Sequence, residues 1–255
     1  MVQDRSFPGA AVKRDVQGVA EPEIFRDRLE RIRERIERAA RLAGRNPVEI
    51  RLIAATKTVS VERLREAAAC GCRTFGENRV QEAVAKMEAL PQASDVEWHF
   101  FGALQSNKIK SVIGRFALLH ALDRVEVAER LEKSLREQTL LQPVLLQVNI
   151  SGEPNKHGFS PEKLVEAALE LANFKHLLVR GLMTIPPPAA SAEHSRSYFR
   201  DLKRLAAQLD SEKIPAIAMT ELSMGMSGDF ECAIEEGATM VRIGSALFGP
   251  RANYD

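Results

Sequence analysis

The first clear pattern along the chain is helical, with apolar residues that recur at steps of three and four. These residues are Phe25, Leu29, Ile32, Ile36, Ala39 and Leu42. Arginine and glutamate fill the positions between them, so the spacing predicts an amphipathic helix, and Gly44 provides a suitable end. Residues 1–20 mix glycine, proline, glutamine and scattered charges without an apolar period, so we expect a flexible N-terminal tail there.

Short apolar runs of strand length then alternate with segments of helical character. The strand-like runs are Glu49–Lys57, Arg73–Glu77, Val96–Leu104, Phe116–Leu122, Val144–Ile150, Leu177–Ile185, Thr220–Met226 and Met240–Phe248. The helical segments are Val61–Ala69, Val80–Leu90, Val125–Glu137, Glu162–Ala172 and Ser195–Leu209, with short helices after Ser106 and after Ser227.

This alternation predicts an α/β fold in which a parallel sheet is joined by helical crossovers. Eight such units in about 250 residues fit a single closed (β/α)8 TIM barrel, preceded by the extra N-terminal helix. We expect the barrel to occupy residues 21–255 as one domain. A doubly wound open sheet is the alternative.

The overall charge gives no indication of a polyanionic partner. The chain has 36 lysines and arginines against 35 aspartates and glutamates, which leaves a net charge of +1. This balance provides no electrostatic case for binding nucleic acid or an anionic membrane surface. The sequence also indicates no shared site for His120, His176 and His194, so we expect no metal centre.

The three cysteines, Cys70, Cys72 and Cys232, cannot all pair with one another. One residue separates Cys70 from Cys72, and no second Cys/His pair completes a zinc-finger pattern. We expect no secretory signal before them, and no apolar run approaches the length that spans a bilayer. We therefore expect free thiols and a cytoplasmic location.

The predicted strands end in polar residues, and TIM barrels carry their functional groups at the carboxyl ends of the strands. Hydroxyl groups and glycines follow the seventh and eighth strands at Ser223, Gly225, Ser227, Gly228, Gly244 and Ser245. With free helix N–H groups they supply the materials of an anion cradle, and barrels frequently bind phosphate at these two loops. Taken singly, each motif is also explained by a helix cap or a strand turn.

The first strand ends in the stretch LIAATKTVS, residues 52–60, which contains Lys57. If Lys57 points into the barrel mouth and faces a phosphate cradle on the opposite side, burial and nearby positive charge favour its uncharged amine. Such an amine forms a Schiff base with a carbonyl compound. A phosphate-bearing aldehyde held between these strands describes pyridoxal 5′-phosphate, and it equally describes the substrate of a sugar-phosphate aldolase.

Four other residues near strand ends have both a structural and a functional interpretation. Arg242 lies in the apolar stretch MVRIGSALF, where it forms either an ion pair at the rim or a fixed cation beneath a ligand. Asn78 either hydrogen-bonds a ring substituent or shapes a turn. His99 ends the third strand, where a single histidine is often structural. Met183 either packs on an aromatic ring or belongs to the core.

At these strand ends the sequence resembles the pyridoxal phosphate homeostasis protein family, over about residues 22 to 251. The segments that carry the resemblance are TKT (56–58), FGENRVQEA (75–83), WHFFGALQSNK (98–108), VNISGEPNKHGF (148–159), GLMTI (181–185), LSMGMSGDFECAI (222–234) and VRIGSALFG (241–249). The resemblance implies a fold-type III barrel similar to the N-terminal domain of alanine racemase. It also implies that pyridoxal phosphate is held as an internal aldimine on Lys57.

The same resemblance implies roles for the other candidate residues. The phosphate would be held by Ser223, Ser227, Gly244 and Ser245, the pyridine nitrogen would face Arg242, and the ring would be lined by Asn78, His99 and Met183. The departures from the family pattern are small. Members often carry serine where this chain has Thr56, and threonine where it has Ser245. Members also often carry Ile-Gly-Pro where this chain has residues 101–103, Phe-Gly-Ala.

Members of this family are regarded as carriers or regulators of pyridoxal phosphate supply, so the resemblance implies a homeostasis role, with apo forms of pyridoxal phosphate-dependent enzymes as partners. An amino-acid racemase or related enzyme is the alternative. A racemase needs a second base opposite the lysine, and the two tyrosines of this chain, Tyr198 and Tyr254, are poorly placed for that role. We therefore expect a carrier rather than an enzyme, as a monomer or weak dimer.

Overall fold

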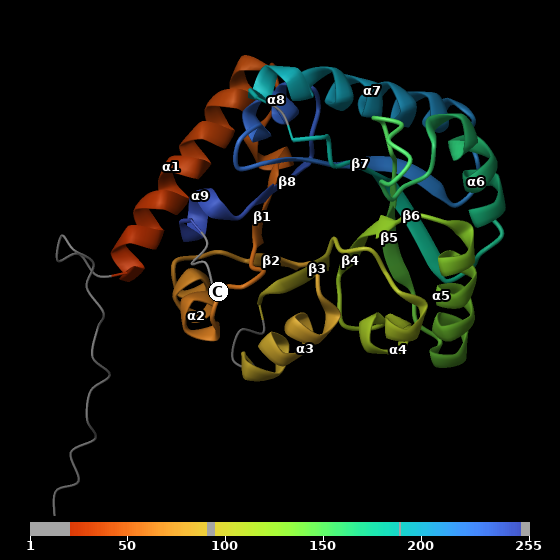
Figure 1. The fold of residues 1–255 in the computed structure, drawn as a ribbon, viewed down its shortest axis with the longest axis horizontal. Helices are drawn as coiled ribbons and strands as arrows, with labels where there is room; N and C mark the ends of the chain where they lie inside the picture. Colours follow the sequence, from red (N-terminus) through yellow and green to blue (C-terminus); the bar gives the residue numbers. More distant parts are fainter. Residues whose placement is uncertain (1–20, 91–94, 189, 251–255) are drawn as a thin grey trace, which may run out of the picture.

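The computed structural model describes residues 21–90, 95–188 and 190–250. The predicted tail, residues 1–20, and Tyr254 lie outside these ranges. Within them, eight parallel strands close into one barrel in the order of the sequence (Figure 1). The strands are β1 (Arg51–Ala55), β2 (Thr74–Glu77), β3 (Glu97–Phe100), β4 (Leu118–Leu122), β5 (Gln142–Gln147), β6 (Leu177–Met183), β7 (Ile217–Met226) and β8 (Met240–Ile243).

The barrel closes because β1 pairs in parallel with β8, and Ala54 lies opposite Ile243 in that pair. The closed order confirms the predicted TIM barrel, and the alternative of an open, doubly wound sheet is wrong. Closure also satisfies the hydrogen-bonding groups of every strand, since a closed barrel has no free sheet edge.

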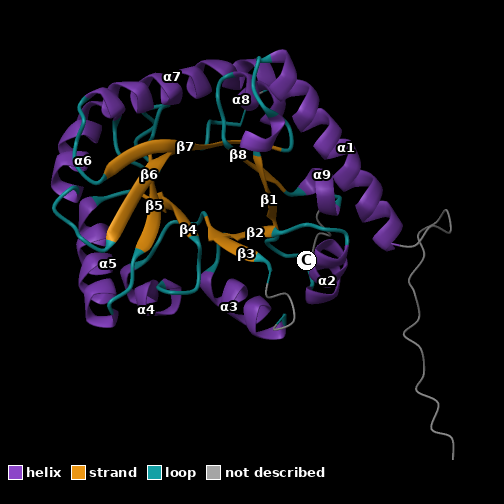
Figure 2. Ribbon diagram, turned by 180° about the vertical axis from the view of Figure 1, so that it is seen from behind, coloured by secondary structure: helices purple, strands orange, loops and turns teal. Residues whose placement is uncertain are grey.

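Helices form the outer layer around the strands, as the reverse view shows (Figure 2). The α-helices of the described residues are α1 (Glu21–Leu42), α2 (Val61–Ala69), α3 (Val80–Ala89), α4 (Ile109–Val112), α5 (Val125–Gln138), α6 (Leu164–Leu171), α7 (Ala192–Ser211), α8 (Phe230–Glu235) and α9 (Ser245–Phe248). Three short 3₁₀ helices accompany them: η1 (Pro47–Glu49), η2 (Ser106–Lys108) and η3 (Pro161–Lys163). The predicted order of helices and strands is thereby confirmed.

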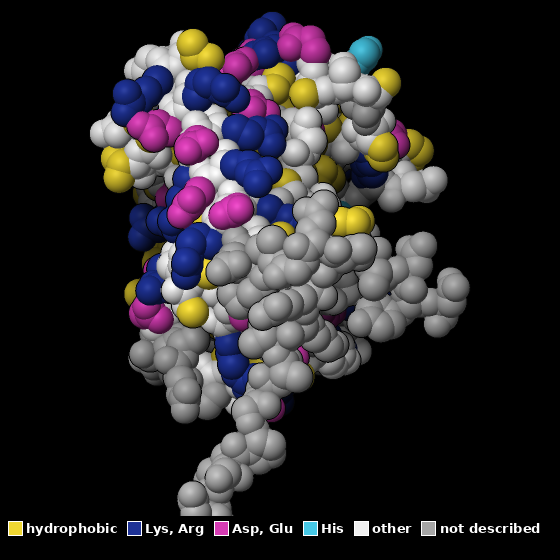
Figure 3. Space-filling view, turned by 90° about the vertical axis from the view of Figure 1, so that its left-hand side faces the viewer, with side chains coloured by type: hydrophobic (Ala, Val, Ile, Leu, Met, Phe, Trp, Pro, Cys, Tyr) yellow, Lys and Arg dark blue, Asp and Glu magenta, His cyan; other side chains and the backbone are white. Residues whose placement is uncertain are grey.

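The extra helix α1 lies along the outside of the barrel, where it packs against α2, α8 and α9 (Figure 1). Its buried side includes Leu29, Ile32 and Ala39, as the helical spacing predicts, whereas Leu42 at the end of the helix is 77% exposed. The face of the molecule that carries α1 presents interspersed positive and negative side chains (Figure 3). This alternation agrees with a net charge near zero, and no described helix is long and apolar enough to span a membrane.

Every predicted strand run differs from the observed strand at one end or both, and three of the runs show how. The run Glu49–Lys57 begins in η1, whose N-terminus is capped by the side chain of Asn46, which accepts a hydrogen bond from the Val48 N–H at 3.2 Å. The run Val96–Leu104 is a strand only as far as Phe100. The run Met240–Phe248 is a strand only as far as Ile243, after which Gly244 precedes the short helix α9.

The barrel interior combines a small apolar cluster with polar groups. The apolar members are Ile53, Leu118, Ala121, Leu145, Met183 and Met240. Buried polar side chains include His99, His120, Ser223 and Arg242. The cysteines Cys70, Cys72 and Cys232 are free, in agreement with the sequence-based expectation.

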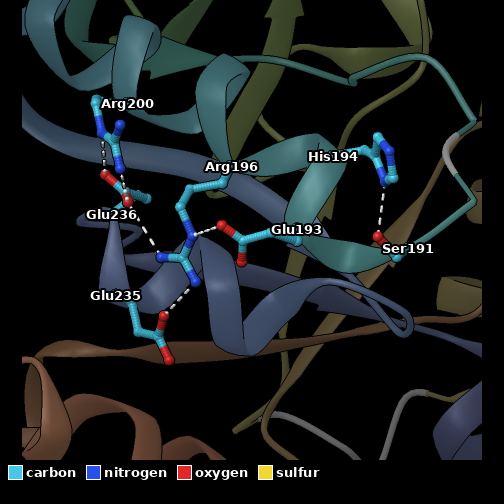
Figure 4. A network of polar contacts seen from close by, with 7 residues as sticks. All are labelled: Ser191, Glu193, His194, Arg196, Arg200, Glu235 and Glu236. Atoms are coloured by element: carbon cyan, nitrogen blue, oxygen red, sulfur yellow. Dashed lines mark hydrogen bonds and ion pairs between the residues drawn. The ribbon is translucent and has the colours of Figure 1, made fainter.

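An ion-pair network joins α7 to α8 on the outer wall (Figure 4). Arg196 contacts Glu193 at 2.7 Å, Glu235 at 2.7 Å and Glu236 at 3.1 Å. Arg200 also contacts Glu236, at 2.9 Å. These contacts raise the pKa of Arg196, the hydrogen bond to Glu193 having the largest effect. The network therefore fixes α8, the helix that follows the β7 loop.

Replacing Arg196 with alanine is expected to lower the free energy of unfolding by roughly 1 kcal/mol, because a network contributes more than an isolated surface pair. The loss should shrink in about 1 M salt, which screens the charges. The matched control is Arg204→Ala on the same helix, since Arg204 is exposed and, among the described residues, forms an ion pair with the partly exposed Asp201 alone. Urea unfolding at two salt concentrations measures both, and equal losses for the two variants would contradict the proposed fixing of α8.

Candidate functional site

Lys57 lies in a tight turn at the carboxyl end of β1. The Val59 N–H donates to the Thr56 carbonyl at 3.0 Å and closes the turn, while the Thr56 N–H donates to the Gly76 carbonyl on β2 at 2.9 Å. Lys57 itself is half-buried. The turn therefore places the backbone of Lys57 at the barrel mouth, where TIM barrels hold their functional groups.

The loops after β7 and β8 meet at the hydroxyl of Ser227. This oxygen accepts hydrogen bonds from the backbone N–H groups of Gly244 and Ala246, both at 3.3 Å. Two main-chain donors thus converge on one oxygen atom, which is the arrangement that an anion oxygen requires. Ser245, at the start of α9, is exposed beside them.

The turn of Lys57 and these two loops are neighbours, because β1 pairs with β8. A Cβ atom at Gly244 would lie 3.3 Å from the carbonyl oxygen of Ala55, two residues before Lys57. The prediction that the cradle lies across the mouth from Lys57 is therefore wrong. The predicted closed barrel already implies that the first and last strands are adjacent, and the pairing of β1 with β8 shows it.

Arg242 lies inside the barrel below these loops and is only 4% exposed. Its guanidinium donates to the Ser223 hydroxyl at 2.6 Å and to the Thr184 carbonyl at 3.0 Å. Burial lowers the pKa of Arg242 to about 10, while the charge of Asp229 raises it, so the group stays cationic at neutral pH. The structure thus presents a fixed cation whose partners are neutral oxygens rather than an ion pair at the rim.

A chain of hydrogen bonds leads from Arg242 through the barrel interior. Beyond Ser223, the hydroxyl lies 2.8 Å from His120 Nδ1, and His120 Nε2 lies 2.9 Å from His99 Nδ1. Burial lowers the pKa of His99 to about 3, and burial together with the neighbouring His99 and Arg242 lowers the pKa of His120 well below its ordinary value. Both imidazoles are therefore neutral at pH 7.

The donors of this chain can be ordered from the chemistry of its ends. The guanidinium of Arg242 can only donate hydrogen bonds, so the Ser223 hydroxyl accepts one from it. The same hydroxyl then donates its own hydrogen bond to His120 Nδ1. His120 then donates through Nε2 to His99, and His99 carries its remaining hydrogen on Nε2. That atom is buried and has no hydrogen-bond partner among the described residues, since the carboxylate oxygen of Glu97 lies 3.8 Å away. Sequence reasoning missed His120 here, although a histidine within the apolar strand LLHAL is a usable signal.

The structure places the remaining candidates as follows. Asn78 follows β2, and its buried Oδ1 has no hydrogen-bond partner among the described residues. A Cβ atom at Gly102 would lie 2.2 Å from the carbonyl oxygen of Asn78, so only glycine allows this approach. Met183 is fully buried in the interior cluster, and His99 lies deeper, against His120. The Ser223 hydroxyl accepts a hydrogen bond from Arg242. The hydroxyl that accepts the backbone N–H of Gly244 belongs to Ser227 instead.

A buried ion cluster beside Lys57 was also missed from the sequence. Lys86 on α3 donates to Glu77 Oε1 and to Glu82 Oε1, both at 2.6 Å, and to the Thr56 carbonyl at 2.7 Å. The available signal was an ion pair at helical i,i+4 spacing, Glu82 and Lys86, next to a glutamate inside a strand.

These residues together suit an anionic carbonyl compound. They provide a primary amine at Lys57, converging N–H donors on the neighbouring loops, a buried cation at Arg242, and an unpartnered buried acceptor at Asn78. No group of three or more metal-ligating side chains exists among the described residues.

Comparison with known proteins gives consistent matches over most of the chain. A family model for the alanine racemase N-terminal domain matches residues 28–252. A protein of Aquifex aeolicus named pyridoxal phosphate homeostasis protein is 48% identical over 88% of this chain and 97% of its own length. A protein of Escherichia coli with the same name is 40% identical over 88% of this chain and 95% of its own length.

Solved structures give the same result. PipY of Synechococcus elongatus, in a structure with pyridoxal phosphate bound, is 35% identical to this chain, with a TM-score of 0.77. The match covers 88% of this chain and 100% of the PipY chain. An alanine racemase of Clostridium difficile is 16% identical with a TM-score of 0.68, covering 91% of this chain and 58% of that one. The second match shows a shared fold and no more.

Proposed function

The chain belongs to the pyridoxal phosphate homeostasis protein family, and from this premise we propose that it binds pyridoxal 5′-phosphate through Lys57 as a carrier or regulator of the cofactor. The observation that carries the proposal is the adjacency of two features at the closing strands. The half-buried amine of Lys57 follows β1, and the N–H donors of Gly244 and Ala246 follow β8 beside it.

Each candidate residue has a proposed role toward the cofactor. Pyridoxal phosphate supplies an aldehyde that condenses with a lysine amine and a phosphate that accepts hydrogen bonds. Lys57 would provide the amine. The phosphate would be held by Ser227, Ser245, Gly244 and Ala246, with Ser223 beneath it as the family resemblance implies.

Arg242 is proposed to face the pyridine nitrogen, with Asn78, Met183 and His99 on the side of the ring. A fixed guanidinium that stays charged opposes protonation of that nitrogen and weakens the ring as an electron sink. The chain of neutral acceptors behind Arg242 keeps its donors in place. This environment favours holding the cofactor over stabilising a carbanion, which supports the carrier role.

The racemase-type alternative rests on fold similarity to a racemase that is 16% identical. Tyr198 lies on α7 in the outer helical layer, so it supports no role as a second base at the mouth. We therefore propose the non-catalytic role. Incubating the loaded protein with L-amino acids in deuterated water is expected to give no selective α-proton exchange, and rapid exchange for one amino acid would favour the enzyme.

Cofactor attachment is tested by replacing Lys57 with alanine. The wild-type protein is loaded with pyridoxal phosphate, reduced with borohydride and digested, and mass spectrometry is expected to find the cofactor on the peptide that contains Lys57. The Lys57→Ala variant should retain no covalent cofactor. Lys108→Ala is the control, because Lys108 is another half-buried lysine that follows a strand. Failure of the wild type to take up cofactor, or labelling elsewhere, would overturn the proposal.

The wider role is proposed from the same premise. We infer that the protein delivers the cofactor to apo forms of pyridoxal phosphate-dependent enzymes, and we place it in the cytoplasm, which three free thiols support. Mixing the loaded protein with an apo-enzyme should restore that enzyme's activity faster than the same concentration of free cofactor. Equal rates would argue against delivery.

A further inference from the structure

Lys86 is a lysine on α3 that is only 6% exposed. An ammonium group has three hydrogens, and each one has an acceptor here: the Thr56 carbonyl at 2.7 Å, Glu77 Oε1 at 2.6 Å and Glu82 Oε1 at 2.6 Å. A buried ammonium is stable only when its charge is compensated and its hydrogens are bonded. The Lys86 ammonium therefore holds these three acceptors together.

Those groups lie on both sides of Lys57. Before it, the Thr56 carbonyl accepts from Lys86, and the Thr56 hydroxyl donates to Glu77 Oε1 at 2.6 Å. After it, the Thr58 N–H donates to Glu82 Oε1 at 2.6 Å. Lys86 and the two glutamates thus fasten the residue before Lys57 and the residue after it to α3 and β2.

The backbone at Thr58 is strained, with a φ of +64°. A β-branched residue rarely adopts the left-handed region, and a turn of this shape favours glycine at that position. Such backbone strain persists only where surrounding contacts hold the conformation, and it is common at functional sites. Here the surrounding group is the carboxylate of Glu82, which accepts the Thr58 N–H.

The charge state of Glu82 agrees with this arrangement. Burial acts to raise the pKa of Glu82, but hydrogen bonds from Lys86 and the Thr58 N–H outweigh it and leave that pKa lowered. Glu82 therefore stays ionised at neutral pH as the acceptor shared by Lys86 and Thr58.

We propose that Lys86 and Glu82 are positioning residues that hold the Lys57 turn in the geometry required for covalent attachment of a carbonyl compound. The inference rests on the proposed function of Lys57. In that attachment the neutral amine forms a C=N bond with the aldehyde carbon, the C=O bond breaks, and the oxygen leaves as water with both amine hydrogens. No oxidation or reduction takes place, so the contribution of the cluster is geometric.

The test separates attachment from binding with two ligands. Pyridoxal phosphate reports attachment, through the rate at which borohydride-reducible cofactor forms on the protein. Pyridoxine 5′-phosphate has the same phosphate and ring but an alcohol in place of the aldehyde, so its affinity reports the rest of the site. The variants are Lys86→Met, Glu82→Ala and the conservative Glu82→Gln, which keeps an acceptor oxygen for the Thr58 N–H. Glu88→Ala is the control, because Glu88 is an exposed glutamate on the same helix.

Lys86→Met and Glu82→Ala are expected to slow attachment at least roughly tenfold, because a misplaced reacting group loses rate steeply. The affinity for pyridoxine phosphate should stay within about twofold, and Glu82→Gln should recover most of the lost rate. If Lys86→Met does not fold, Glu82→Ala decides alone, since Glu82 is partly exposed. Wild-type attachment rates in Glu82→Ala, or equal losses for both ligands, would overturn the inference. No uptake by the wild type would instead overturn the proposed function.

Discussion

Lowering the pH from 7 to 5 is expected to remove about 4 kcal/mol from the free energy of unfolding, through two buried histidines. His99 and His120 are enclosed in the barrel, where burial lowers the pKa of His99 to about 3 and that of His120 well below its ordinary value. The folded protein therefore keeps both rings neutral across this range. Their place in the hydrogen-bonded chain to Ser223 depends on that neutrality.

In the unfolded chain each histidine takes up a proton once the pH falls below about 6.5. The unfolded state is stabilised by this uptake and the folded state is not, so stability is complete above pH 6.5 and is lost as the pH falls toward 3. At pH 5 the loss is about 2 kcal/mol for each histidine. Burial raises the pKa of Glu77, which acts in the opposite direction and offsets part of the loss.

Urea unfolding of the wild type and of His99→Gln and His120→Gln at both pH values isolates the histidines. Each variant is less stable at pH 7, but its loss between pH 7 and pH 5 should be about 2 kcal/mol smaller than that of the wild type. Glu77 is present in all three proteins, so its effect cancels in the comparison. The same pH dependence in the wild type and both variants would show that the rings are protonated in the folded barrel.

Replacing Gly181 with alanine is expected to cost roughly 4 kcal/mol or more, or to prevent folding. Gly181 on β6 lies opposite Glu221 on β7, and a Cβ atom at Gly181 would lie 1.8 Å from the Glu221 carbonyl oxygen. Neither the Gly181 Cα nor the Glu221 carbonyl can move aside, because both belong to the hydrogen-bonded backbone of β6 and β7. The methyl group would separate the strands just before Ser223, which pairs with Met183.

The matched control is Gly44→Ala, after the end of α1. Gly44 has a φ of +67°, but a Cβ atom there would meet no atom within 4 Å. Its replacement should cost only about 1 to 2 kcal/mol, the usual penalty of a left-handed residue. Urea unfolding of both variants measures the difference, and loss of soluble protein for Gly181→Ala alone would agree with it. Equal stability of the two would show that β6 and β7 can move apart.

The periodicity of the sequence predicts this fold well, because each strand and helix buries a face that repeats along the chain. Helix Val61–Ala69 matches its predicted bounds. The largest error lies where one apolar run serves two elements, in Met240–Phe248, whose second half packs as helix α9. Apolar content predicts burial there, but it cannot distinguish a strand from a short helix.

The site was predictable where its chemistry is local and missed where it depends on contacts across the barrel. A lysine at a strand end and serines among glycines are visible in the sequence. The links between His99 and His120, and between Lys86 and Glu77, join different elements. These contacts depend on how neighbouring strands and helices pack, whereas the pairing of β1 with β8 places the cradle beside Lys57 instead of opposite it.

The pairing of β1 with β8 has a consequence for synthesis of the protein. The ribosome makes Lys57 early, but Gly244 and Ala246 leave the exit tunnel among the last residues of the barrel. Until β8 emerges and joins β1, a nascent chain has the reactive amine without the donors beside it. If Lys57 anchors the cofactor as proposed, capture follows the completion of β8, and a chain that stops before β8 carries Lys57 without the donors of Gly244 and Ala246.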